Sequence, residues 1–332
     1  MDKERKEIME TIQQKSAFRP SRGMAFIAAL WVTAAIVFAW SMPALGAPSQ
    51  RLFSSPEDAL KALVEAVKAK DKAMLDQILG PSGKDLRSGD KVEDVAEFDE
   101  LATHLAEKTS LVKESDAKVI IHIGKEGWPF PIPIVRTDGQ WFLDTEAGKE
   151  EILNRRIGEN ELIAMLVCRT YVKAQREYTL KDWDGDGIFA YARKLRSDPG
   201  KKNGLFWRAA PGEEVSPLGE LVAKARMEGY KKKASAFKEE RPSPFHGYHF
   251  KILTRQEKNA PGGKYNYLIN GNMVGGFALA AFPSNWGKSG VMTFIVNQQG
   301  KVYQKNLGPD TTKIAREMKS YNPDKTWTPA EE

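Results

Sequence analysis

The sequence predicts an α+β protein in two parts: N-terminal helices with an antiparallel hairpin, then a long helix with an antiparallel sheet. Three observations lead to this fold class. Apolar residues recur at helical spacing in residues 56–109 and again in residues 146–178. Short apolar runs bounded by Gly, Pro and Asn fill residues 248–305, as is typical of strands. With 332 residues, 41% of them hydrophobic, the chain is long enough for two domains.

The chain begins with the features of a secretory signal peptide. Met24–Trp40 holds no charged residue, two arginines precede it, and the small residues Ala44–Ala47 follow it. This basic, apolar and small-residue order is what export requires. We therefore expect residues 1–47 to be a signal peptide cleaved near Gly46 or Ala47, and the remaining chain to be periplasmic or secreted.

A retained membrane anchor is the alternative for this segment. Its apolar run of 17 residues falls between the roughly 7–15 of a signal peptide and the roughly 20 of a membrane span. Pro43 and the small residues after it favour cleavage. The inner membrane is expected as a partner only if this segment is kept as one N-terminal helix.

Charge and cysteine content narrow the function classes. The net charge is +6, and a mild basic excess can favour anionic envelope surfaces. Nucleic acid is not an expected partner, because no aromatic-interleaved basic motif occurs. The densest basic cluster, Lys224–Arg241, is interpreted as a solvated connecting segment. The one cysteine, Cys168, lies in an apolar run and is predicted to be a buried thiol.

Capping residues predict three helices in the N-terminal part. Ser55 precedes a proline and two acidic residues, which together start a helix. Asp71 starts a second, short helix that ends at Gly80. A third helix is predicted over Val92–Thr109, with apolar residues on one face.

Strands are predicted to follow these helices. Ala117–Ile123 is β-branched and apolar. In Trp128–Ile134 the prolines fall at every second position, so all their missing N–H donors lie on one side. We interpret this segment as an edge strand that cannot recruit a neighbour, and display of a proline-rich peptide is the alternative. A turn at Thr137–Gly139 leads into the strand Gln140–Asp144.

The second part begins with helices. Glu146–Arg156 and Leu162–Tyr178 are predicted as two helices joined near Gly158. This joint is taken as the boundary between an N-terminal domain, residues 48–157, and a C-terminal domain, residues 158–332.

Five short runs then predict the antiparallel sheet: Tyr248–Leu253, Tyr265–Ile269, Phe277–Phe282, Val291–Val296 and Val302–Lys305. Asn297–Gly300 is predicted to be a tight turn, and Asp310 to begin a last helix that ends near Lys319.

The best candidate for a binding site is an aspartate loop. Its three aspartates alternate along the chain: Asp182, Asp184 and Asp186. Followed by Gly187, they match the first ligand positions of a calcium loop. Ala190 and Arg193 stand where further ligands are expected, so half the ligand set is present. The alternative is an Asp/Gly turn that caps a helix over Ile188–Leu195. No other cofactor is predicted.

Catalytic motifs are incomplete in this sequence. His246 and His249 flank the start of a predicted strand and lack a third fixed partner, so a structural role is expected. Neither His-Glu-x-x-His nor Gly-x-Ser-x-Gly occurs. Loop aromatics could form a contact surface, but anchoring of loops onto the core is favoured. These aromatics are Trp183, Phe206, Trp207, Trp286 and Trp327.

The chain resembles a bacterial family catalogued as domain of unknown function 2950. The resemblance rests on these stretches: Trp128–Pro133, Glu151–Gly158, Asp182–Gly187, Ser216–Gly219, His246–Tyr248, Ala260–Gly263, Gly275–Ala278, Ser289–Phe294 and Asn306–Thr311. It covers nearly all of the exported chain. It implies an exported bacterial protein with no established activity, and it supplies no catalytic residues.

Two further resemblances concern the fold. The element order in Leu52–Asp144 is similar to cystatin-like or nuclear-transport-factor-like α+β domains. The later part is similar in element order to the globular heads of type IV pilins and pseudopilins. The shared order is a helix with Tyr171, Gln175 and Tyr178, then an Asp/Gly loop, then the later strands. The N-terminal pilin helix and its processing site are missing.

Two functions remain open. The incomplete catalytic motifs favour a non-enzymatic envelope module, either binding or structural. Its partner would be an envelope protein or a polysaccharide. An envelope hydrolase acting on wall or carbohydrate polymers is the alternative, through carboxylates that the sequence does not pair. A cleft with two convergent carboxylates, one of raised pKa, favours the hydrolase. A closed convex surface favours the module.

Overall fold

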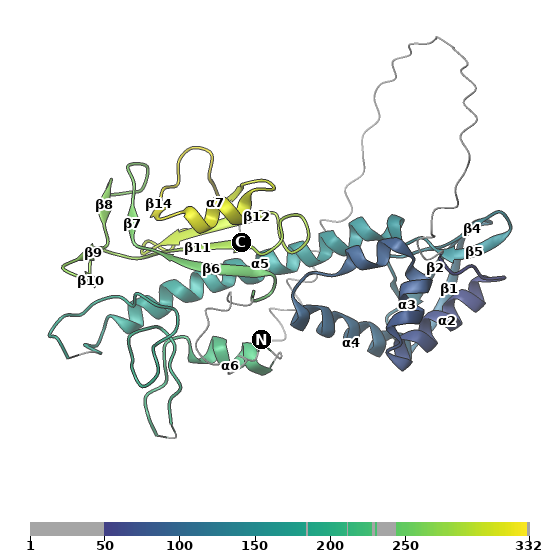
Figure 1. Cartoon of the computed structure of the whole chain (residues 1–332), viewed down its shortest axis with the longest axis horizontal. Coiled ribbons are helices and arrows are strands. Elements are labelled where there is room, and N and C mark those ends of the chain that lie inside the picture. The colour runs from purple at the N-terminus through teal and green to yellow at the C-terminus, as the bar shows by residue number, and fades with distance from the viewer. Residues whose placement is uncertain (1–49, 184, 211, 228–229, 231–243, 331–332) are drawn as a thin grey trace, which may run out of the picture. The chain divides into compact units, whose positions relative to one another are not determined.

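The structure is a computed structural model that describes residues 50–183, 185–210, 212–227, 230 and 244–330. It is a mixed α+β fold in which N-terminal helices and a hairpin sheet lead into one long helix and a second antiparallel sheet (Figure 1). The predicted signal peptide, residues 1–47, and most of the basic cluster Lys224–Arg241 lie outside the described residues. Within the described part, no helix has the length and apolar character that a membrane crossing needs.

Side-chain caps start the N-terminal helices. The helices are α2 (Pro56–Ala69), α3 (Lys72–Leu79), the 3₁₀ helix η1 (Pro81–Leu86) and α4 (Lys91–Glu107). The Ser55 side chain accepts the Asp58 N–H at 3.1 Å, and Asp71 accepts the Met74 N–H at 3.0 Å, so both predicted starts are confirmed. Asp90 caps α4 by accepting the Val92 N–H at 3.0 Å.

The first sheet is antiparallel. Its strands are β1 (Thr109–Ser115), β2 (Lys118–Ile123), β3 (Trp128–Pro129), β4 (Ile134–Thr137) and β5 (Gln140–Leu143). They lie in the order β1-β2-β4-β5, and β3 pairs with β2. Asp138 and Gly139 form the β4–β5 turn with positive φ, as predicted. Strand β1 was not predicted, because it is largely exposed on both faces and so shows no apolar alternation.

The proline-rich segment Trp128–Ile134 is an edge strand only in part: β3 pairs with β2 alone, whereas Ile134 begins β4, which lies between β2 and β5. The Phe130 N–H donates to a β2 carbonyl at 2.7 Å, as alternate pairing requires. On the other side, the Pro133 carbonyl accepts the Asp144 N–H at 2.9 Å, and Gly148 packs so closely that a Cβ there would lie 2.8 Å from the Pro131 carbonyl. The donor-free side is therefore covered by the next helix, which needs no donors. Burial of Phe130 and Pro133 also excludes peptide display.

Helix α5 (Thr145–Tyr178) replaces the two helices that were predicted to join near Gly158. A glycine inside a helix costs about 1 kcal/mol relative to alanine, which a helix of 34 residues packed on both sides tolerates. One hydrophobic core is built from residues 53–143 and contacts Ile152, and the other is built from residues 164–321 and contacts Leu162. The division into domains at residue 157 stays a prediction.

The second sheet packs against α5. Its strands are β6 (Tyr248–Leu253), β11 (Ala278–Pro283), β12 (Met292–Asn297), β13 (Tyr303–Asn306) and β15 (Thr328–Pro329), in the order β15-β13-β12-β11-β6. All neighbours are antiparallel. Helix α5 lies along one face and α7 (Thr311–Glu317) lies against the other (Figure 1). The predicted strands and last helix of this part are confirmed in position, apart from Tyr265–Ile269, which is broken into two short strands.

Small elements complete the second part. A three-stranded sheet joins β7 (Arg255–Gln256), β8 (Tyr265–Asn266) and β14 (Ser320–Tyr321). A short hairpin joins β9 (Leu268–Ile269) and β10 (Asn272–Met273), and α6 (Gly219–Met227) follows the loops after α5. Cys168 is fully buried in the α5 interface, where burial raises the pKa of its thiol to about 12, so the prediction of a buried thiol is confirmed.

Candidate functional site

The aspartate loop follows α5 and is organised by its own side chains. Asp182 accepts the N–H groups of Gly185 and Gly187, both at 2.8 Å. Asp186 accepts the Ile188 N–H at 2.8 Å and the Asn272 side-chain amide at 3.1 Å. A carboxylate oxygen that accepts one N–H keeps a second lone pair, so these bonds orient the loop without preventing a cation from binding.

The residues after the loop are irregular, with one isolated β-bridge at Tyr191, so the predicted helix over Ile188–Leu195 is wrong. The Gln175 side chain accepts the Ala192 N–H and donates to the Ala192 carbonyl, both at 2.8 Å. Tyr191 pairs with Met273 of β10, its N–H donating at 2.8 Å. These contacts occupy the Tyr191 N–H and both backbone groups of Ala192, which are therefore not available for the hydrogen bonds of a helix.

Calcium binding at this loop stays a prediction. Asp184 lies outside the described residues, and among the described ones no three acidic, His or Cys side chains are grouped as metal ligands. Arg193, at the terminal ligand position, donates to the Gly271 carbonyl at 2.9 Å. Any cation would therefore rest on the aspartates and backbone carbonyls of the loop.

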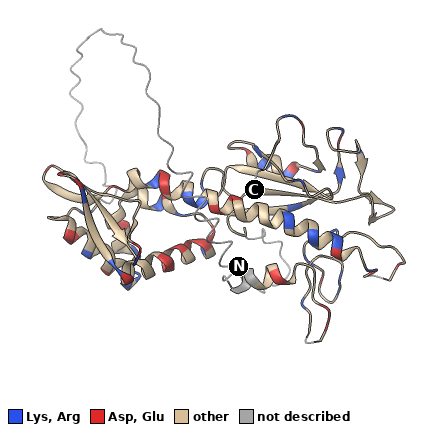
Figure 2. Cartoon of the chain, turned by 180° about the vertical axis from the view of Figure 1, so that it is seen from behind, with Lys and Arg blue, Asp and Glu red and all other residues tan. Residues whose placement is uncertain are grey.

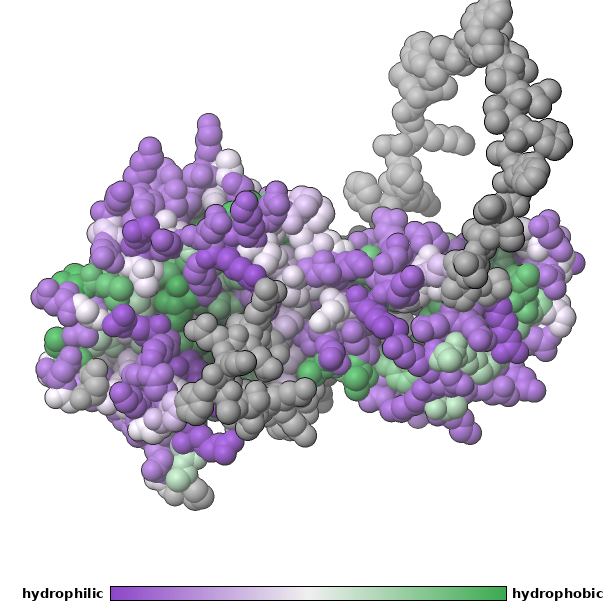
Figure 3. Space-filling model, viewed as in Figure 1, coloured by the Kyte–Doolittle hydropathy of each residue, from purple (hydrophilic) through white to green (hydrophobic). Residues whose placement is uncertain are grey.

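Exposed apolar residues lie on the segments that adjoin the aspartate loop. We call this set the apolar tip, and it consists of Leu180, Ile188, Phe189, Ile269 and Val274. Leu180 is 72% exposed and Phe189 is 61% exposed. Figure 3 shows apolar surface beside β9 and β10 at the left of the view. Isolated exposed apolar residues are common, but a group of large ones on adjoining loops is typical of an interaction site.

Hydrogen bonds hold the segments of the apolar tip together. The Thr179 hydroxyl donates to the Phe189 carbonyl at 3.2 Å, which places Leu180 beside Phe189. The Asn272 bond to Asp186 and the Arg193 bond to Gly271 join the aspartate loop to the β9–β10 hairpin. The apolar side chains are thus presented on a bonded framework.

A second polar cluster lies at the start of α4 and was missed from the sequence. Asp90 is buried, and besides capping α4 it accepts the Tyr230 hydroxyl at 3.0 Å and the Gly247 N–H at 3.4 Å. The Tyr230 hydroxyl in turn accepts the His246 N–H at 3.0 Å. One carboxylate therefore ties the N-terminal helices to the segment that leads into β6.

Glu93, one turn further along α4, is the second acid of this cluster. It is 9% exposed, and burial raises its pKa from 4.5 to about 7, while neighbouring Asn160 and Arg156 oppose the rise. Arg156 is already engaged, because it binds both Glu97 oxygens, at 2.7 and 2.5 Å, and donates to the Leu86 carbonyl. Glu93 Oε2 and Arg156 Nη1 are buried without a hydrogen-bond partner among the described residues.

The remaining contacts of this cluster come from α5. Asn160 is buried and donates to the Ser289 carbonyl at 3.1 Å. The Ser289 hydroxyl donates to the Gly247 carbonyl at 2.9 Å. Gly247 has a φ of 67°, and a Cβ there would lie 2.7 Å from the Ser289 Cβ, so only glycine lets these two backbones approach. We call Asp90, Glu93, Arg156, Asn160, Tyr230, Gly247 and Ser289 the α4 cluster.

The sequence contained partial signals for this cluster. Arg156, Gly247 and Ser289 fall in stretches that carry the family resemblance, but nothing in the sequence assigned them to one place. His246 contributes its backbone N–H and packs its ring on Tyr230 at 5.4 Å. His249 stacks on Phe282, and burial lowers its pKa.

The loop aromatics mostly anchor loops, as favoured from the sequence. Phe206 and Trp207 are buried. Trp183 lies 4.7 Å from Trp207 between ring centroids and donates its indole N–H to the Tyr178 carbonyl at 2.8 Å. Trp286 donates to Asn306 at 3.0 Å. The indole N–H groups of Trp183 and Trp286 therefore donate hydrogen bonds within the fold.

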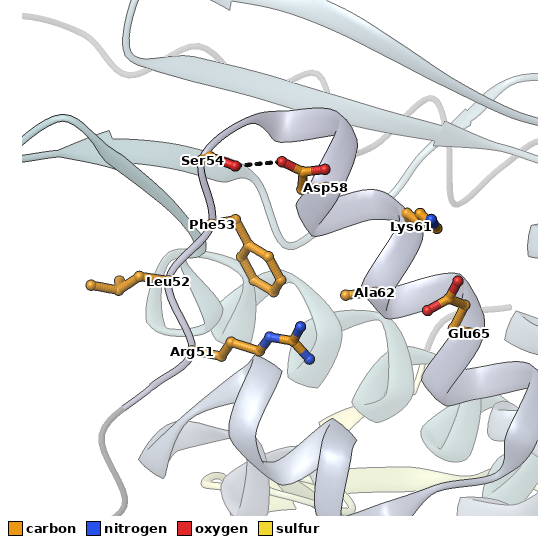
Figure 4. A pocket seen from close by; sticks show the side chains of 8 residues that line it. All are labelled: Arg51, Leu52, Phe53, Ser54, Asp58, Lys61, Ala62 and Glu65. Atoms are coloured by element: carbon orange, nitrogen blue, oxygen red, sulfur yellow. Dashed lines mark hydrogen bonds between the residues drawn. The ribbon is translucent and has the colours of Figure 1, made fainter.

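An open groove lies at the start of α2 (Figure 4). Arg51, Phe53, Asp58, Lys61 and Glu65 line it, with three smaller contributions from the same segments. Asp58 accepts the Ser54 hydroxyl at 2.6 Å, and this bond, with the Ser55 hydroxyl, lowers its pKa. Asp58 and Glu65 stand two helical turns apart, so they do not converge on one point.

Comparison with known proteins gives one match. The model of a family described as "Protein of unknown function (DUF2950)" matches residues 50–330. No curated protein and no solved structure matches the chain.

Proposed function

The chain belongs to the DUF2950 family of proteins of unknown function, and we propose that it is an exported cell-envelope module that binds a protein partner through the apolar tip. The observation that carries this proposal is the exposure of Leu180 and Phe189 beside three other large aliphatic side chains. Partner binding would remove this apolar area from water, at about 25 cal/mol per Å².

Residue types at the tip favour a protein over a polysaccharide. Sugars are bound by aromatic rings with polar groups at their edges, and the tip has a single aromatic residue, Phe189, among aliphatic ones. Protein interfaces instead combine a fully apolar centre with a polar rim. Asp186 and Arg193 would lie at that rim.

Export is supported by the order of basic, apolar and small residues in 1–47. For the finer fold, we propose a pilin-head-like arrangement of α5 on the second sheet and a cystatin-like or nuclear-transport-factor-like N-terminal domain. Their support is the packing of α5 on β11 and β12 and the order of helices before a hairpin sheet.

The experiment is site-specific photo-crosslinking in the source bacterium. A photoreactive amino acid is placed at residue 189 or, as a matched control, at Val112, which is 45% exposed on the edge strand β1. We expect a discrete cross-linked protein from position 189 only, in the envelope fraction. Cross-links of equal yield and pattern from both positions, or none from 189, would contradict the proposal.

The hydrolase remains the second candidate, because Asp90 and Glu93 are two buried acids at the start of α4 and Glu93 has a raised pKa. The bonds of Asp90 to Tyr230, Gly247 and its own helix leave this pair directed into the fold. Release of soluble sugars from purified wall polymers by the exported chain, abolished in Glu93→Gln, would favour the hydrolase over the binding module.

A further inference from the structure

The α4 cluster places one acid where its charge is poorly compensated. Acidic residues gather along α4 (Figure 2). The charged and titratable groups of the packed elements that interact with Glu93 or with its partners are Asp90, Asp94, Glu97, Arg156, Tyr230 and His246. The cation that acts on Glu93 is Arg156, and its guanidinium already binds both oxygens of Glu97.

Neutral partners compensate the charge of Glu93 only in part: hydrogen bonds from Asn160 and Ser88 lower its pKa, but both side chains also bond elsewhere. Asn160 gives an N–H to the Ser289 carbonyl, and the Ser88 hydroxyl donates to the Asp90 carbonyl at 3.1 Å. An ionised Glu93 would therefore be a buried carboxylate near Asp90 and Glu97, with shared donors only. A protonated Glu93 avoids this cost, which fits the raised pKa of about 7.

We propose that Glu93 is a pH-sensitive latch that holds the start of α4 against α5 and the segment before β6 when it is protonated, and loosens these contacts when it is ionised. This inference does not depend on the proposed function. The contacts released would be those of Asp90 with Tyr230 and Gly247, and of Asn160 with Ser289.

The opening of these contacts should increase as the pH rises. Opening exposes Glu93 to water, where its pKa returns to about 4.5, so opening releases one proton between about pH 4.5 and 7. The opening equilibrium therefore rises by up to about ten-fold per pH unit in this window and levels off above pH 7.

Hydrogen exchange of the exported chain tests the latch. The reporters are the N–H groups of Ser88, which donates to Asp94 at 2.7 Å, and of Gly247. Between pH 5 and 7.5, after correction for intrinsic exchange, we expect opening at both sites to increase by tens of fold in the wild type. Glu93→Gln should remove this dependence, and the control Glu100→Gln, an exposed acid on the same helix, should keep it.

Three results would overturn the latch: a wild type without the pH dependence, a Glu93→Gln variant that retains it, or a Glu100→Gln variant that loses it. If Glu93→Gln does not fold, carbon-13 NMR titration of the Glu93 carboxyl in the wild type decides the matter. A midpoint between about pH 6 and 8 supports the latch, and one near 4.5 rejects it.

Discussion

The apolar tip and the α4 cluster use acidic side chains in opposite ways. At the tip, Asp182 bonds to residues three and five positions away, and large apolar side chains are left in water. In the α4 cluster, Asp90 bonds to residues 140 and 157 positions away, and the polar groups are buried. The first region is therefore suited to meeting a partner, and the second to holding parts of the chain together.

Removing the central cation of the α4 cluster should have the largest effect. Arg156→Met leaves Glu93 and Glu97 without their cation, and loss of one partner from a buried pair costs about 3–5 kcal/mol. Because Glu97 is partly exposed, we expect the lower end of that range. Urea unfolding measures this loss of stability.

The neighbouring Arg155→Met is the control, because it loses only an exposed ion pair with Glu151 and should cost less than about 0.5 kcal/mol. Equal losses for the two arginines would reject a special role for the cluster.

The pH dependence of stability should come next in size. The pKa of Glu93 is raised in the folded chain, so its contribution is fully present below about pH 4.5 and is lost as the pH rises to about 7. The shift from 4.5 to about 7 corresponds to at most roughly 3 kcal/mol. Urea unfolding at several pH values should show the wild type weakening relative to Glu93→Gln across this window. A constant difference between the two would contradict the assigned pKa.

Local contacts could be predicted from the sequence, and distant ones could not. Ser55, Asp71 and the Asp138–Gly139 turn act within a few residues, and each was predicted correctly. Segments tied to distant elements were misread: Ile188–Leu195 is irregular rather than helical, because its backbone bonds to Gln175 and Met273.

The same limit explains the two candidate regions. The spacing of the aspartates in residues 182–186 is visible in the chain, so that loop was found. The α4 cluster draws on residues 90 to 289, and no periodicity or motif links positions so far apart. The proline segment was predicted only in part for a related reason, since its pairing on one side was expected and occurs with β2, but only the return of α5 shows that its other side is covered.

Calcium should have a smaller effect, centred on the tip. If the aspartate loop binds calcium with a Kd near 1 mM, then 10 mM calcium stabilises the folded chain by roughly 1.4 kcal/mol. A thermal melt of the exported chain with and without calcium measures the shift. Asp184→Ala should abolish it, and Glu100→Ala, far along the sequence from the loop, should retain it. No shift in the wild type at millimolar calcium would remove the metal from this loop.

The smallest effect on stability is expected at the apolar tip itself. Phe189 is 61% exposed, so Phe189→Ser removes little buried area and should change the free energy of unfolding by less than about 0.5 kcal/mol. The same substitution at Phe277, which is fully buried against Tyr171 and Tyr191, should cost at least about 3 kcal/mol. With the photoreactive amino acid moved to position 180, which is also exposed at the tip, capture of the partner should nevertheless fall in Phe189→Ser and persist in Val112→Ser. A residue that contributes nothing to folding but is needed for capture acts as a binding residue, whereas unchanged capture in Phe189→Ser would leave the tip as ordinary exposed surface.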